Sequence, residues 1–325
     1  MLTFADDTKI VYPVNSVNDK ILLQNDLDSI ISWSNNNNMV LNKGKFELLT
    51  HRQTKINPNL NLLHILPFNS LFNSYNTSKF SDISPSTHVR DLGITITSDL
   101  DWDLHINNIC KSATKISFWI LNIFYSREKT TMITLFNSLV RSKLEYCCQL
   151  WNPEKTKHID AIERIFRGFS RKIDNMAQFD YWTRLKKLNL MSLQRRRERS
   201  IIILVWKIKN NLAPNDINLD FKTNIRNNKI DAVVKPMAKC LGKTRTSFEN
   251  SFIIKSAKIW NRLPFPLREI SNLNLFKKQL DIYLNYIPDE PPVQGYFHKC
   301  KNSILDYKTF DYNYATVSKS NKLDG

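Results

Sequence analysis

Two adjacent carboxylates, Asp6 and Asp7, lie near the beginning of the sequence between two short β-prone runs. Such runs around an acidic pair predict a hairpin with the pair at its tip. Like charges this close repel each other unless a hard cation lies between them, and Mg²⁺ binds carboxylate oxygens together with substrate phosphates. The pair therefore suits metal-assisted phosphoryl transfer. Aspartate is also a common turn residue, so a solvated turn is the alternative.

A basic stretch at residues 195–199 is the second group with a chemical use. Arginines along a helix flank can contact successive phosphates, with an affinity that falls with salt and carries little sequence preference. Tyr181 and Trp182 are available for stacking on unpaired bases. The alternative is a solvated helix face with Trp182 in the core. The candidate nucleic-acid-binding residues are Arg184, Lys186, Lys187, Arg195, Arg196 and Arg199, with Arg171 and Lys172 beside them.

The charge of the chain is uneven along its length. The 325 residues carry a net charge of +17, which points to a polyanionic partner such as nucleic acid or an acidic membrane surface. Residues 161–210 hold thirteen basic and four acidic residues, whereas residues 1–50 hold four basic and six acidic ones. This contrast favours phosphate contact in the middle of the chain and a different role for its beginning.

The sequence also excludes several function classes. The six glycines are never close enough together to form a Gly-rich phosphate cradle, which excludes dinucleotide-binding fingerprints and P-loops. The five cysteines never form C-x-x-C and the six histidines show no metal spacing, which argues against a zinc knuckle and a disulfide scaffold. No leader opens the sequence, and its longest aliphatic run, Ile201–Val205, is too short to span a bilayer. We expect an intracellular chain, nuclear or cytoplasmic, that is not secreted and has no membrane partner.

Hydrophobic spacing predicts the elements that position these residues. After the first hairpin we expect a helix capped by Asp19 and continuing through residues 23–31, a second hairpin over 39–49, a loop over 57–86 and a strand over 89–96. Apolar steps of three and four then predict helices over residues 106–120, 132–139, 159–173 and 192–210. Consecutive amphipathic helices of this kind form a bundle.

The segment Phe4-Ala5-Asp6-Asp7 resembles the Φ-Ala-Asp-Asp motif of reverse transcriptases, in the Phe form common among non-LTR (LINE-type) retrotransposons. Later segments keep the order of that family, and the resemblance extends to about Tyr286. These segments are the helix after the hairpin, Leu41-Asn42-x-x-Lys45, Val89-Arg90-Asp91-Leu92-Gly93, Leu139-Val140-Arg141 through Trp151-Asn152-Pro153, and Trp260-Asn261-Arg262-Leu263-Pro264.

The resemblance implies an RNA-directed DNA polymerase that copies an RNA template from a DNA primer. Asp6 and Asp7 would bind the catalytic Mg²⁺ with a third aspartate, and Lys45 would lie near the incoming nucleotide as a proton donor to pyrophosphate. Leu92 and Gly93 would form a primer-grip-like contact, where glycine allows a close backbone approach. Two structural alternatives stay open: Lys45 as a surface lysine in a turn, and Gly93 as a glycine that eases a strand bend.

Pattern and resemblance together predict an α+β fold in five parts. An incomplete palm-like β/α remnant is followed by a mainly helical thumb-like bundle and a helical C-terminal region. The expected parts are residues 1–97 for the palm remnant, 98–210 for the thumb-like bundle with the basic helix, 211–247 for a linker, 248–287 for a small folded segment and 288–325 for a polar tail.

The sequence departs from the family at its start, because only three residues precede the motif. The fingers and the strand with the third aspartate are absent, and one carboxylate pair fixes neither the metal ions nor the nucleotide. We therefore expect a C-terminal fragment of a reverse transcriptase that is inactive alone. The alternatives are a non-catalytic nucleic-acid-binding helical module and a decayed element fragment without selected activity.

Overall fold

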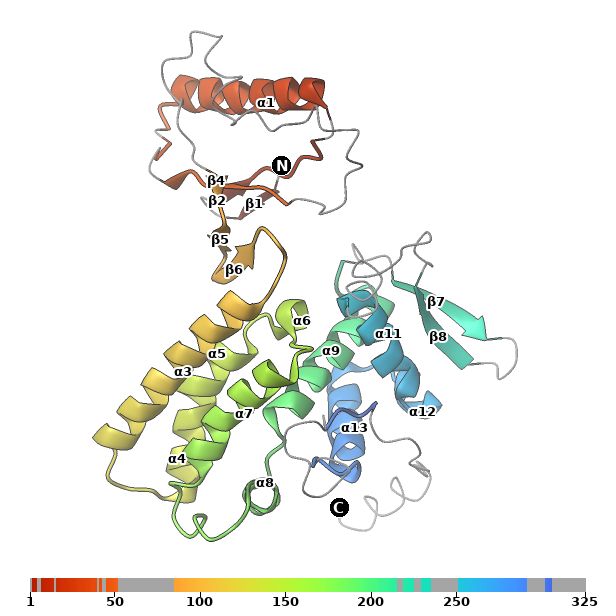
Figure 1. The fold of residues 1–325 in the computed structure, drawn as a ribbon. Helices are drawn as coiled ribbons and strands as arrows, with labels where there is room; N and C mark the ends of the chain where they lie inside the picture. Colours follow the sequence, from red (N-terminus) through yellow and green to blue (C-terminus); the bar gives the residue numbers. More distant parts are fainter. Residues whose placement is uncertain are drawn as a thin grey trace. The chain divides into compact units, whose positions relative to one another are not determined.

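The computed structural model combines helices with two-stranded sheets, in agreement with the predicted α+β class (Figure 1). The chain divides into two compact units, residues 1–89 with 97–100 and residues 90–96 with 101–325. We call them unit 1 and unit 2 and describe each by itself. The structure describes residues 2–4, 7–14, 16–39, 41–42, 45–51, 85–214, 219–224, 229–234, 251–290 and 302–305.

Unit 1 begins with the predicted hairpin. Strand β1 (Leu2–Phe4) pairs antiparallel with β2 (Asp7–Lys9), with Phe4 opposite Asp7. Helix α1 (Val17–Asn36) follows and ends within the run of asparagines, as expected. Its N-cap is Ser16 and not Asp19, because the two residues form a reciprocal capping box.

The remaining strands of unit 1 differ from the prediction. Strand β3 (Leu48–Leu49) pairs parallel with β4 (Pro85–Ser86), so it does not form the hairpin predicted over residues 39–49. Most of the predicted loop lies outside the described residues. The single strand predicted over residues 89–96 is instead a hairpin of β5 (His88–Asp91) and β6 (Ile94–Thr97), within which the chain passes between the two units.

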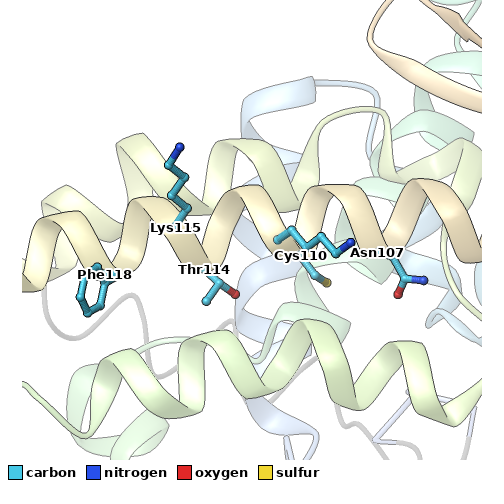
Figure 2. A pocket seen from close by; sticks show the side chains of 6 residues that line it. Asn107, Cys110, Thr114, Lys115 and Phe118 are labelled. Atoms are coloured by element: carbon cyan, nitrogen blue, oxygen red, sulfur yellow. The ribbon is translucent and has the colours of Figure 1, made fainter.

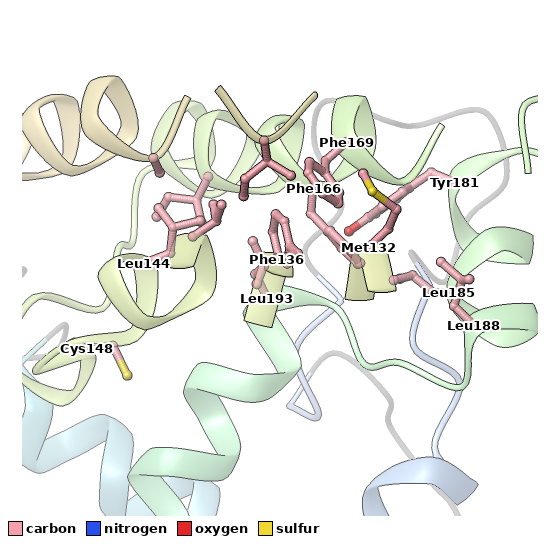
Figure 3. Packing of buried hydrophobic residues seen from close by; sticks show 14 of the residues in the cluster. Met132, Phe136, Leu144, Cys148, Phe166, Phe169, Tyr181, Leu185, Leu188 and Leu193 are labelled. Atoms are coloured by element: carbon pink, nitrogen blue, oxygen red, sulfur yellow. The ribbon is translucent and has the colours of Figure 1, made fainter. Parts of the chain in front are cut away.

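The first core of unit 2 is a helical bundle. Helix α3 (Asp103–Ile123) packs against α7 (Thr156–Ser170) and against the π-helical segment η3 (Phe136–Arg141). The centroid of the Phe136 ring lies 4.4 Å from that of Phe166 and 4.9 Å from that of Phe169, at the centre of this core (Figure 3). The other helices here are α4 (Lys129–Leu135), α5 (Ser142–Glu145), α6 (Cys148–Trp151) and α8 (Tyr181–Leu188), of which α5, α6 and α8 lie outside the predicted helix ranges.

The second core of unit 2 forms around aromatic rings. The Phe276 ring stacks on that of Trp206 at a centroid distance of 5.4 Å and lies 6.2 Å from that of Trp260. This core includes part of the predicted linker over residues 211–247, because β7 and β8 pair antiparallel there and bury Leu219. The linker prediction is wrong for these strands. The elements are β7 (Leu219–Asn224), β8 (Lys229–Val234), α11 (Phe252–Arg262), α12 (Phe265–Arg268) and α13 (Leu273–Tyr286).

Helix α9 (Leu193–Lys209) belongs to both cores. Leu193 packs in the first core, whereas Ile201 and Trp206 pack in the second. The helix contacts α6 and α7 and also α11 and α13 (Figure 1). Because neighbouring helices cover α9 on several sides, its arginines are buried or half-buried. Among the described residues, no helix is both long enough and apolar enough to cross a bilayer.

Candidate functional site

Asp7, the described residue of the acidic pair, begins strand β2 of the first hairpin. Asp7 is exposed at the beginning of β2, opposite Phe4, and Asp6 lies outside the described residues. In the described part of the chain, no three His, Cys, Asp or Glu side chains are grouped so that they could hold a metal ion. Because Asp7 is exposed, its carboxylate oxygens are accessible to a cation. The predicted Mg²⁺ site stays a prediction.

Lys45 also lies on the surface of unit 1. Its side chain is exposed, and its backbone N–H donates a hydrogen bond to the carbonyl of Asn42 at 3.1 Å. This bond closes a short turn within the Leu41-Asn42-x-x-Lys45 segment. Both the proposed role near the nucleotide and the surface-lysine alternative are compatible with an exposed ammonium group.

Leu92 and Gly93 form the tight turn between β5 and β6. Their φ angles are 45° and 86°, and a two-residue hairpin turn commonly needs positive φ at both positions. The hydroxyl of Tyr146 donates a hydrogen bond to the Leu92 carbonyl at 3.0 Å, which ties the turn to the helical bundle. Gly93 is thus explained by the turn it makes, and a contact with a primer stays a prediction.

Arg195, predicted to bind phosphate, is completely buried. Its Nη1 donates to the carbonyls of Leu284 (3.2 Å) and Ile287 (3.3 Å), and its Nη2 donates to those of Pro288 (3.0 Å) and Asn302 (3.1 Å). These bonds join the beginning of α9 to the end of α13. The predicted phosphate contact of Arg195 is wrong, because no part of its side chain reaches solvent.

Arg184 is buried for a similar reason. Its guanidinium donates to the hydroxyl of Ser170 at 3.1 Å and to the carbonyls of Phe179 (2.6 Å) and Arg167 (3.0 Å). Burial lowers the pKa of Arg184. Its hydrogen bonds hold α8 against the end of α7. Because the side chain is buried, the prediction that it binds phosphate is also wrong.

Arg196 and Arg199 are half-buried and paired with carboxylates. The guanidinium of Arg196 donates through two nitrogens to the two oxygens of Glu145, with Nη2 at 3.0 Å from Oε2. Arg199 pairs in the same way with Asp281, with its Nη2 at 2.9 Å from Oδ2. Both charges are matched by bidentate carboxylate partners, and the predicted phosphate contact of these two arginines stays a prediction.

Lys186 and Lys187 remain on the surface, but both have partners. The ammonium of Lys186 lies 3.3 Å from the carboxylate of Glu290, and that of Lys187 lies 4.2 Å from the centroid of the Phe179 ring. Tyr181 is buried and donates a hydrogen bond to Glu163, and Trp182 is partly buried against the first core. Tyr181 therefore cannot stack on a base. Trp182 packs against the first core, as the alternative interpretation in the sequence analysis expected.

The two Trp-Asn motifs have structural roles in unit 2. Trp151 and Trp260 are fully buried, one in each core. The side chain of Asn152 accepts a hydrogen bond from Nε of Arg197 at 3.0 Å. The amide of Asn261 donates to the Ala232 carbonyl at 3.0 Å and accepts from its N–H at 2.8 Å, which fixes β8 on α11.

A groove along α3 is a surface feature that the sequence analysis missed. It is a shallow, open stretch of surface whose lining residues all belong to α3, and Lys111 and Lys115 are exposed there. In Figure 2, Asn107, Cys110, Thr114 and Phe118 lie along one side of the helix, and Lys115 points away from them. Phe118 is 61% exposed and Trp119 is 52% exposed, and the ammonium of Lys115 lies 5.0 Å from the centroid of the Trp119 ring. The lining residues are Asn107, Cys110, Lys111, Thr114, Lys115 and Phe118.

The groove combines cationic and aromatic groups without a reactive thiol. Burial raises the pKa of Cys110 to about 11, so this thiol is neutral near pH 7. A sequence signal for the groove existed in the spacing of Lys111, Lys115 and Trp119, which places all three on the side of the helix away from Ile106 and Ile120. The analysis followed the apolar stripe of this helix and passed over its exposed side.

Comparisons with known proteins give a sequence relative without a stated activity. The chain is 27% identical over 117 residues to "Uncharacterized protein B0403.1" of Caenorhabditis elegans. The aligned region covers 35% of this chain and 59% of that protein, so the chain spans less than two thirds of the length of this relative. No family model matches the chain. No solved structure matches it either.

Proposed function

We propose that this chain is the C-terminal portion of a reverse-transcriptase-type polymerase of the non-LTR class, which copies RNA into DNA. The observation that carries the proposal is the β1–β2 hairpin. Its register pairs Phe4 with Asp7, the first and last residues of the segment that resembles the Φ-Ala-Asp-Asp motif, which supports the proposal. The exposure of Asp7 supports a role in which its carboxylate meets a cation.

The order of the elements after the hairpin also supports this proposal. Helix α1 follows the hairpin, as the palm helix follows the Asp-Asp motif in the family, and Lys45 and the turn at Leu92 and Gly93 come next. In this proposal, the helices of unit 2 correspond to the thumb-like and C-terminal regions. The arginines of α9 then serve to hold these helices together, because their partners are carbonyls and carboxylates of neighbouring elements.

The described residues do not complete a magnesium site by themselves. Asp7 supplies one carboxylate, and the described part of the chain groups no three candidate ligands. Metal-assisted phosphoryl transfer needs each ion held by several oxygen ligands. The proposal assigns a further aspartate to polypeptide that precedes this hairpin in the full polymerase, and we assign no catalytic step to this chain alone.

The coding sequence upstream of Met1 tests this proposal. Full-length transcripts that contain the chain would be sequenced, and the genomic DNA before them would be translated in all three frames. We expect codons for fingers and for a palm strand with an aspartate, either in the same frame or interrupted by stop codons. Unrelated sequence over the length of such a segment would contradict the proposal.

The α3 groove favours a second candidate function, the binding of a single nucleic-acid strand. Lys111 and Lys115 supply charges for phosphates, and Phe118 and Trp119 supply exposed rings on which bases can stack. This arrangement replaces the basic helix as the candidate nucleic-acid interface, because the arginines of α9 are buried or paired. This second candidate function does not depend on whether the chain belongs to a polymerase.

Salt-dependent binding of a labelled oligonucleotide tests the groove. Lys111→Ala/Lys115→Ala would flatten the plot of log affinity against log salt by about 0.7 per lost phosphate contact on a single strand. Phe118→Ala would weaken binding without changing this slope. The matched control is Lys258→Ala/Lys278→Ala, which removes the same charge from exposed positions on the second core. Equal slopes for the two double variants would show that the groove does not bind the strand.

A further inference from the structure

Helix α7 carries three arginines on its outer side. Arg164, Arg167 and Arg171 follow one another at steps of three and four residues, which places them on one side of the helix. Arg171 is the C-cap residue and keeps helical backbone angles. Ile162 and Phe166, which pack in the first core, lie on the opposite side. Arg164 and Arg171 are exposed and Arg167 is half-buried, so the row faces solvent.

The charges of this row are not used inside the protein. Within the described residues, the side chains of Arg164 and Arg171 have no ion-pair or hydrogen-bond partner. The guanidinium of Arg167 lies over the Tyr181 ring, with its Cζ 5.1 Å from the ring centroid. The arginines of α9, in contrast, bond to groups of neighbouring elements. The row on α7 therefore has charge available for a ligand.

Positive charge dominates around the row. Of the two acidic residues of α7, Glu163 is buried, and Asp160 forms no ion pair in the described part of the chain. Burial lowers the pKa of Arg184, and the charges of Arg171 and Arg167 lower it further. A concentration of one sign of charge at an exposed helix face attracts a polyanion.

Gly168 lies in the middle of the row. It is exposed, and an added Cβ would meet no atom within 4 Å, so packing does not require a glycine here. A glycine inside a helix lowers stability relative to alanine. What it provides is open surface between the arginines, where the backbone of a ligand can approach closely. We call Arg164, Arg167, Gly168 and Arg171 the α7 stripe.

The length and composition of the α7 stripe fit the backbone of a nucleic-acid duplex. Seven helical steps separate Arg164 from Arg171, a rise of about 10.5 Å. One strand of a duplex carries a phosphate about every 3.4 Å along the axis, so about three phosphates fall within this length. The stripe has no aromatic ring for an unpaired base, unlike the α3 groove, and no apolar side chain to insert into a membrane.

We propose that the α7 stripe binds the phosphate backbone of a nucleic-acid duplex without reading its sequence. The arginines donate to phosphate oxygens, and the glycine admits the backbone between them. This site is separate from the single-strand site proposed for α3, and it depends neither on that site nor on polymerase activity.

Binding of a labelled blunt-ended DNA duplex to the full chain at several salt concentrations tests the stripe. Arg164→Gln/Arg171→Gln should flatten the plot of log affinity against log salt by about 0.9 per lost phosphate contact. The matched control, Lys258→Gln/Lys278→Gln, removes the same charge from exposed positions on the second core and should keep the wild-type slope. Both variants should keep the thermal midpoint of the wild type, because the replaced side chains are exposed. Equal slopes for the two variants would contradict the proposal.

A pair of variants at Gly168 tests the middle of the stripe. Gly168→Glu and Gly168→Gln add side chains of the same size that differ by one charge. The glutamate variant should bind the duplex about fivefold more weakly than the glutamine variant, as expected for one like charge about 4 Å from a phosphate in water. Equal duplex affinities of these two variants would show that no phosphate lies at the stripe.

Vesicles of phosphatidylcholine and phosphatidylserine are the second probe, because a membrane surface is also polyanionic. Arg164→Gln/Arg171→Gln should lose more affinity for the duplex than for the vesicles. A larger loss for the vesicles would assign the stripe to a membrane and contradict the proposal. The same slope change should appear when the double variant is made in the background Lys111→Ala/Lys115→Ala, which separates the stripe from the α3 groove.

Discussion

At the scale of single residues, the main finding is that the most basic stretch of the sequence is structural. Arg195 satisfies four backbone carbonyls from inside the protein, and Arg196 and Arg199 pair with carboxylates of other helices. A run of arginines has the same composition on a nucleic-acid surface and in a buried network. The sequence could not separate the two cases, because the partners Glu145 and Asp281 are 51 and 82 residues away from their arginines.

Arg195→Met should destabilise the chain strongly. The variant removes a buried cation and leaves Glu198 and Asp289 without its charge, which costs about 3–5 kcal/mol of unfolding free energy for a broken buried pair. Urea denaturation followed by circular dichroism measures the loss. The control is Lys172→Met at an exposed position, which should change stability by less than about 0.5 kcal/mol. A similar small change in both variants would mean that Arg195 is not a structural residue.

Glu198 should make stability depend on pH. Burial raises the pKa of its carboxyl from 4.5 to about 7. The folded state therefore binds this proton more tightly than the unfolded state, and the stability that it contributes is present below pH 4.5 and lost as the pH rises to about 7. Glutamine does not titrate, so the variant Glu198→Gln lacks this loss. As the pH rises between these values, the free energy of unfolding of the variant should therefore increase relative to that of the wild type, by up to about 3 kcal/mol.

The comparison of Glu198→Gln with the wild type at pH 5 and pH 8 isolates this group. Asp103 has the opposite effect, because its hydrogen bonds with Asp101, Lys155, Lys157 and His158 lower its pKa. Its contribution is present in both proteins and cancels in the difference. A stability difference that does not change with pH would show that Glu198 is not the titrating group.

At the scale of elements, the helices with a clear apolar stripe and the first hairpin were predicted well, and the later strands were not. The stripes of α3, α7 and α9 lie where the sequence places them, because each helix packs its apolar side in a local bundle. The parallel pairing of β3 with β4 joins residues 48–49 to 85–86, and β7 and β8 are stabilised by α11. Such pairings depend on tertiary contacts that a short run of residues does not encode.

The hairpin of β5 and β6 gives a prediction at this scale. Gly93→Ala should lower stability by about 1 kcal/mol, because an alanine at a φ of 86° is strained. A Cβ at this position would lie 3.6 Å from the Tyr146 ring, which is an ordinary contact, so the cost comes from the backbone.

Gly168→Ala is the matched control for this turn. Gly168 is exposed within α7 and an added Cβ there meets no atom within 4 Å, so alanine should raise stability by about 0.5–1 kcal/mol. Thermal denaturation of the two variants should shift the midpoint in opposite directions. If both variants shift the midpoint in the same direction, the positive φ of the turn does not explain the need for glycine at position 93.

At the scale of the whole molecule, the chain combines a weakly acidic beginning with strongly basic later residues, and the two regions fall mostly in different units. Many of the later cations are used inside unit 2, and the α3 groove keeps Lys111 and Lys115 on the surface. The proposed chemistry rests on the hairpin of unit 1. The motif residues could be found from the sequence because they are adjacent in it, whereas the buried and paired state of the arginines of α9 could be seen only in the folded structure.

Template-dependent primer extension tests the polymerase proposal most directly. The protein to be assayed is the longest reading frame that contains this chain, with interrupting stop codons replaced, together with an RNA template, a DNA primer, nucleotides and Mg²⁺. We predict extension that Asp7→Asn abolishes and that Asp26→Asn, an exposed aspartate of α1, leaves intact, and no extension by the 325-residue chain alone. A folded extended protein that makes no product, or one whose product does not depend on Asp7, would contradict the proposal.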